Sequence, residues 1–167
     1  MFEWFSSKVA MSVAVIILVA AMIGFFAYIN SRVSSVEFSS IPEAIASAVD
    51  RTATTNENIT TRVTFVDGST NGTYIDPMFK NNGYHIMISS SEAVVQQSSL
   101  TASAAFSKKI HLWKPDSTVE VTKKATLDGK DALSPPLEFE SGKDFLIENK
   151  RLTVDLVYEY HCFIYFP

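Results

Sequence analysis

Three histidines and one cysteine are the residues of this chain best suited to acid–base, nucleophilic or metal-binding chemistry. His85, His111 and His161 are far apart in the sequence, and each lies in a pattern typical of a β-strand. Unless folding gathers them, isolated strand histidines are usually structural. His161 and Cys162 are neighbours, but successive strand residues point to opposite faces, which is a poor arrangement for holding one ion.

Other chemical motifs are missing from the sequence. It contains no phosphate-binding glycine loop, nucleophile elbow or nucleotide fingerprint. Cys162 is the only cysteine, so an internal disulfide is excluded, and its apolar surroundings predict a small buried side chain. We therefore expect no enzyme activity, no catalytic residue and no cofactor.

One loop resembles the start of a calcium site of the EF-hand type. Its oxygen-bearing side chains stand at alternate positions: Asp67, Ser69, Asn71 and Thr73. The sixth position is Gly72, but the twelfth is Met78 instead of the closing glutamate, and the flanking residues are strand-like. An ordinary hairpin loop explains the pattern better, with calcium binding as the minor alternative.

Two sequons for N-glycosylation follow the apolar N-terminal part of the chain. Asn58 and Asn71 are the candidate acceptors, in Asn58-Ile59-Thr60 and Asn71-Gly72-Thr73. A chain rich in serine and threonine also forms such triplets by chance. The sequons favour an exported domain.

The organising element is the uncharged segment from Val9 to Ile29. As a helix rising about 1.5 Å per residue it spans roughly 32 Å, close to the hydrocarbon thickness of a bilayer. A buried core helix would need a larger apolar domain around it, and a cleaved secretory signal would have a shorter apolar region. We expect a single transmembrane helix, in which Ala20 and Gly24 form a small-xxx-small pair suited to helix packing.

The flanks of this segment differ little in charge. Residues 1–8 form a short cap or leader with interfacial aromatic residues, and Lys8 balances Arg32 on the far side. We expect a single-pass protein of the cell membrane, with the head outside.

A second helical pattern lies within residues 30–56, a linker followed by an amphipathic helix. Ser40 is suited to cap this helix, Pro42 to its first turn, and Ile41, Ile45 and Val49 recur at helical spacing. This segment either continues the anchor as one helix bent near Pro42 or lies as a separate helix against the head.

Residues 57–167 change to a strand period and are predicted to form a β-rich extracytoplasmic domain. Short runs of β-branched and aromatic residues occupy 61–65, 84–89, 92–96, 103–106, 110–113, 119–123, 145–148, 152–158 and 160–166. Pairs such as Asp67-Gly68 and Asn82-Gly83 mark turns between them. The predicted fold is α+β: an N-terminal transmembrane helix with a helical extension, followed by an antiparallel β-sandwich or β-sheet head.

The charge of the chain argues against a nucleic-acid partner, and we expect none. The net charge is −4, the 14 lysines and arginines are scattered, and no basic cluster forms. The membrane and other protein subunits are the expected partners.

The layout resembles archaeal type IV pilin-like proteins, including minor pilins and the membrane-anchored stator proteins of the archaellum. The resemblance lies in the peptide ending in Lys8, the uncharged helix, the continuation IPEAIASAVDRTA, and the strands NNGYHIMISSSEAVVQQ and TASAAFSKKIHLW. It implies a helix that forms a filament core or a membrane anchor, a β head outside, and cleavage between Lys8 and Val9. The glutamate usual at the fifth position after such a cut is replaced by Val13.

These features predict a structural or interaction protein, a pilin-like component of an archaeal cell-surface filament or envelope assembly. Its partners would be other pilin-like or envelope subunits, including further copies of itself in a homo-oligomer or filament. The alternative is a membrane-anchored, ligand-binding surface module, with calcium in the Asp67 loop as one form of it.

Overall fold

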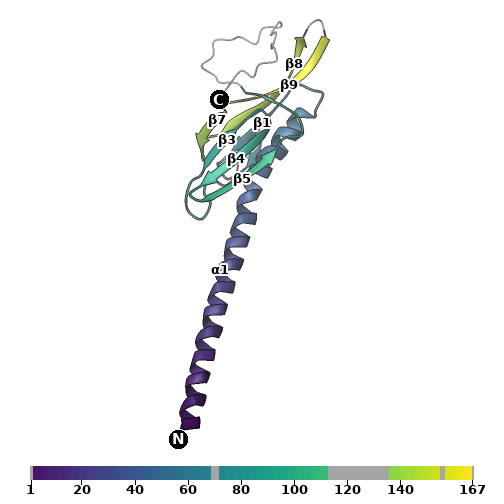
Figure 1. The fold of residues 1–167 in the computed structure, drawn as a ribbon. Coiled ribbons are helices and arrows are strands. Elements are labelled where there is room, and N and C mark those ends of the chain that lie inside the picture. Colours follow the sequence, from purple (N-terminus) through teal and green to yellow (C-terminus); the bar gives the residue numbers. More distant parts are fainter. Residues whose placement is uncertain (1, 69–71, 113–135, 155–156, 167) are drawn as a thin grey trace. The chain divides into compact units, whose positions relative to one another are not determined.

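The computed structural model describes residues 2–68, 72–112, 136–154 and 157–166 (Figure 1). The elements are helix α1 (Phe2–Ala53) and strands β1 (Ile59–Thr64), β2 (Thr73–Tyr74), β3 (His85–Ile88), β4 (Glu92–Gln97), β5 (Leu100–Ala105), β6 (His111–Leu112), β7 (Leu137–Glu140), β8 (Phe145–Val154) and β9 (Val157–Tyr165). The chain divides into two compact units, Met1–Glu37 and Phe38–Pro167. The predicted class, one N-terminal helix followed by a β-sheet head, is confirmed.

The first unit is helical and apolar. Helix α1 is long and apolar enough to span a membrane. Its large side chains between Val9 and Ile29 are exposed, from 41% for Ile29 to 73% for Met11. Ser12 donates its hydroxyl to the Lys8 carbonyl (3.0 Å), so this polar group bonds within the helix. The surface of this segment is therefore apolar on all sides, as lipid requires.

The second unit begins with the last turns of α1, which form part of its core. Phe38, Ile41, Ile45 and Val49 are at most 9% exposed and recur every three or four residues. Of the two alternatives for this segment, one continuous helix is correct, and Pro42 lies inside it. The same residues also pack into the head.

The four-stranded sheet has the order β5-β4-β3-β7 and is antiparallel throughout. Ile86 and Ile88 of β3 are fully buried, while the alternate residues His85 and Met87 are partly exposed. This is the period-two pattern of a sheet with one face in the core.

The five-stranded sheet has the order β2-β1-β8-β9-β6. Its centre is antiparallel, but β2 pairs with β1 and β6 with β9 in parallel. These two short edge pairs are parallel, whereas the predicted antiparallel arrangement holds for the longer strand pairs described. Each parallel pair joins only two residues of each strand. It therefore adds a short parallel edge to a sheet whose centre is antiparallel.

One hydrophobic core joins both sheets to the helix. Its members from α1 include Ile45 and Val49, and those from the sheets include Val95, Ile147 and Ile164. Strands β2 and β7 were not predicted, and the predicted strands 145–148 and 152–158 form β8 and the start of β9. The predicted strand 119–123 lies outside the described residues.

Polar contacts fix the end of α1 to the strands. Asp50 accepts hydrogen bonds from the backbone N–H and the hydroxyl of Ser107, both at 2.8 Å. Thr52 donates to the Thr61 hydroxyl of β1 (2.7 Å). Asn149 of β8, itself 1% exposed, donates its side-chain amide to the Thr55 carbonyl. The helix therefore ends at a defined place in the head.

Truncating the helix within the core should destabilise the head. Ile45 is fully buried, so Ile45→Ala should lower the free energy of unfolding by about 2–5 kcal/mol. Glu43→Ala, on the exposed side of the same turn, should change it by less than about 0.5 kcal/mol. Denaturant unfolding of the full chain in detergent, followed by near-UV circular dichroism, measures both. Equal effects would contradict a core built on residues 38–53.

Candidate functional site

Folding brings two of the three histidines together on the five-stranded sheet. The parallel pairing of β6 with β9 sets His111 opposite Phe163, and His161 Nδ1 lies 2.9 Å from His111 Nε2. A hydrogen bond between two imidazoles needs a proton on one nitrogen and a lone pair on the other, so at least one ring is neutral. Folding therefore gathers two of the three strand histidines, the alternative left open from the sequence.

The signal for this pair was absent from the sequence. His111 and His161 are separated by 50 residues, and only the two-residue parallel contact of β6 with β9 aligns them. Cys162 lies on the opposite, buried face, as the strand period predicted. Among the residues that the structure describes, no three His, Cys, Asp or Glu side chains are grouped to hold a metal ion.

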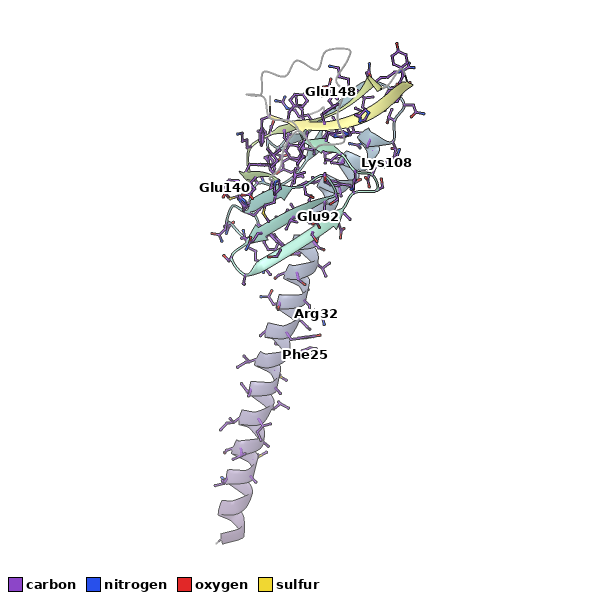
Figure 2. The ribbon with its side chains drawn as sticks, turned by 45° about the horizontal axis from the view of Figure 1, so that its top comes forward. Phe25, Arg32, Glu92, Lys108, Glu140 and Glu148 are labelled. Atoms are coloured by element: carbon purple, nitrogen blue, oxygen red, sulfur yellow. The ribbon has the colours of Figure 1, made fainter. Side chains whose placement is uncertain are left out.

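The third histidine lies beside two carboxylates on the outer face of the four-stranded sheet. His85 pairs with Glu140 across β3 and β7, and its Nδ1 lies 3.2 Å from Glu140 Oε1. Its Nε2 lies 3.7 Å from Glu138 Oε2. Figure 2 labels Glu140 on this sheet. Both carboxylates are more than half exposed, so the contacts contribute at most about 1 kcal/mol and form a solvated charge cluster.

The loop with the calcium-like pattern is only partly described. Asp67 is exposed, and Ser69 and Asn71 lie outside the described residues. The hydroxyl oxygen of Thr73 accepts a hydrogen bond from Arg51 Nη2 (3.1 Å). A guanidinium at this oxygen repels a second cation, which argues against calcium here.

Gly72 has a steric role in the same loop. A Cβ at this position would lie 2.5 Å from the Arg62 carbonyl oxygen of β1. The glycine therefore allows the close backbone approach from which β2 pairs with β1. This explains a glycine at the sixth loop position without a metal ion.

Cys162 is a structural thiol. It is 5% exposed, and burial, with a smaller contribution from the Asp50 charge, raises its pKa to about 12. The thiol is neutral at physiological pH, and a neutral thiol is a poor nucleophile and metal ligand.

The exposed surface of the anchor is the most extensive apolar surface described. Phe25 and Phe26 are more than 60% exposed, and Figure 2 shows Phe25 and Arg32 projecting from α1. Arg32 Nε lies 3.2 Å from the Tyr28 hydroxyl, a pairing suited to the edge of a membrane. Lys8 and Val9 are exposed within α1, and cleavage between them stays a prediction.

The small-residue pair lies on this surface. Ala20 and Gly24 are both exposed and one helical turn apart. Among the described residues, no atom lies within 4 Å of a Cβ added at Gly24. Added bulk at Gly24 therefore causes no clash among the residues that the structure describes.

Comparison with family models, with curated proteins and with solved structures finds no match.

We expect Cys162 to resist alkylation in the folded protein. With its pKa near 12, its thiolate fraction at pH 8 is more than roughly 100-fold below that of an exposed cysteine. In Ser103→Cys, the added thiol on the exposed side of β5 should react at once, while Cys162 reacts only after denaturation. Counting alkylated thiols by intact mass measures this. Rapid labelling of Cys162 in the native protein would contradict its burial.

Alkaline pH should destabilise the head through Tyr84. Its hydroxyl donates to the Asp76 carbonyl (2.5 Å), and burial, then the charges of Asp76 and Tyr74, raises its pKa above the ordinary value. Because folding favours the neutral phenol, stability is full below about pH 10, the unfolded pKa, and falls as pH rises above it.

The test compares melting temperatures between pH 8 and pH 11. Tyr84→Phe should lose about 1 kcal/mol at neutral pH with its hydrogen bond, and its stability should decline less at high pH. Tyr158→Phe, at a tyrosine that is 61% exposed, is the matched control. An identical alkaline decline in wild type and Tyr84→Phe would refute the assignment.

Proposed function

We propose that this protein is a single-pass, membrane-anchored surface protein of pilin-like architecture, which acts by associating with neighbouring subunits. The observation that carries the proposal is the composition of α1. Its residues from Val9 to Ile29 expose apolar side chains, whereas Phe38, Ile45 and Val49 are core residues of the head. One helix thus supplies both an anchor and a structural core.

The anchor's surface supports association as the mode of action. The small pair Ala20 and Gly24 permits close approach of another helix, and no atom of the described residues lies within 4 Å of a Cβ at Gly24. The described chemical groups are a histidine pair bonded ring to ring, an exposed charge cluster and a buried, neutral thiol. We therefore propose a component of an archaeal cell-surface filament or envelope assembly rather than an enzyme.

We place the head outside the cell, as the resemblance to archaeal pilin-like proteins implies. The departure at Val13 from the usual pilin pattern favours a minor pilin or a permanently anchored relative over a major filament subunit. The alternative, a ligand-binding module with bound calcium, has less support because Arg51 bonds to Thr73.

The proposal predicts that assembly depends on the face of Gly24. Gly24→Leu should reduce the size of the assembly extracted from the native membrane, and Gly24→Ala should have a smaller effect, because the added bulk obstructs a neighbouring helix. Met22→Phe adds bulk to the opposite face and should leave the size unchanged.

Native mass spectrometry after mild detergent extraction measures both subunit mass and assembly size. A subunit beginning at Val9 in a large assembly would identify a filament subunit, and one beginning at Met1 in a small, discrete assembly would identify a permanent anchor. A wild-type protein that is monomeric in its own membrane would refute association as the function.

A further inference from the structure

The first sequon lies at the end of the head opposite the residue where the chain enters it. The head begins at Phe38, and its helical part runs to Ala53, a rise of roughly 24 Å. Asn58 follows five residues later, directly before β1, and it is exposed together with Asn56 and Glu57. Asn58 is therefore accessible on a surface that the core does not use.

The Asn58 side chain is held in one orientation. The β1–β8 ladder ends at the pair Ile59 and Asn149, and the Oδ1 atom of Asn58 accepts the backbone N–H of Arg151 (2.8 Å). Since the donor is a backbone N–H, the amide oxygen must face β8. The Nδ2 atom is the other branch of the amide and takes no part in this bond.

The third sequon residue lies on the accessible side as well. Thr60 is exposed on β1, whereas Ile59 between the two is only partly exposed. Residues two apart at the start of a strand share a side. Both side chains that define the sequon therefore face solvent together.

From these observations we propose that Asn58 is an N-glycosylation site, an inference that rests on the proposed export of the head. The donor would be a lipid-linked oligosaccharide whose anomeric carbon carries a phosphate or pyrophosphate. A bond forms between Nδ2 and the anomeric carbon, the bond from that carbon to the phosphate oxygen breaks, the lipid phosphate leaves, and Nδ2 gives up one proton to a base of the transferase.

The product is compatible with the folded head. Glycosylation replaces one hydrogen on Nδ2 and keeps Oδ1 as a carbonyl-type acceptor. The hydrogen bond from Arg151 N–H therefore survives the modification. The proposal is confined to Asn58, because Asn71 lies outside the described residues.

The test is the mass of one tryptic peptide from the full protein, purified from its native cells. Cleavage after Arg51 and Arg62 releases residues 52–62, which contain Asn58 as their only sequon. In the wild type we expect this peptide to gain the mass of a glycan. Thr60→Ser should keep the glycan, and Thr60→Val should abolish it with Asn58 intact.

Asn58→Asp is the matched control for folding. The aspartate keeps an acceptor oxygen for Arg151 N–H but has no amide nitrogen to glycosylate, so the protein should fold without the glycan. A peptide of unmodified mass in the wild type, or a glycan that persists in Thr60→Val, would overturn the proposal.

A separate measurement distinguishes failure of this inference from failure of the proposed function. In Ser103→Cys, a membrane-impermeant thiol reagent applied to intact cells reports the side of the head, because Cys162 is buried. Labelling together with a glycan supports both proposals. Labelling without a glycan overturns only the Asn58 site, and a head that is labelled only after lysis overturns the export on which both depend.

Discussion

Apolar side chains on a helix surface must be shielded from water. The structure of this protein depends on what shields them in the two parts of α1. The large side chains from Val9 to Ile29 are exposed within the helical unit, so a lipid bilayer is the solvent that suits them. From Phe38 onward the apolar side chains form a stripe, which the two sheets cover. The same interaction thus accounts for both the anchor and the head.

The head is organised around the last turns of this helix. Asp50 and Thr52 bond to Ser107 and Thr61, which fixes where the strands lie against the helix. The long β8–β9 hairpin and the β3–β4–β5 meander then bring their apolar faces into one core. A head without residues 38–53 would expose this core to water. The structural domain therefore begins at Phe38 and includes the last turns of α1.

The chemistry of the described surface agrees with a role in association. His85 is solvated with its two glutamates, and Cys162 is buried as a neutral thiol. His111 and His161 bond to each other. The Gly24 surface of α1 and the exposed sequon at Asn58 are the two places where we propose an interaction with another molecule.

The sequence by itself determined the anchor, the helical stripe and most of the strands, because each depends on a local period of side chains: an uncharged run, a repeat of three to four residues, or alternation. Tertiary structure alone decided the short pairs of β2 with β1 and β6 with β9, the single helix through Pro42, and the His111–His161 contact. A strand of two residues is too short to show an alternation of buried and exposed side chains. A contact between residues 50 positions apart depends on the register of the strands that lie between them in the chain. Local sequence patterns therefore predicted the helix and most strands, and which side of each is buried. Only the folded core determined which of these elements lie against one another.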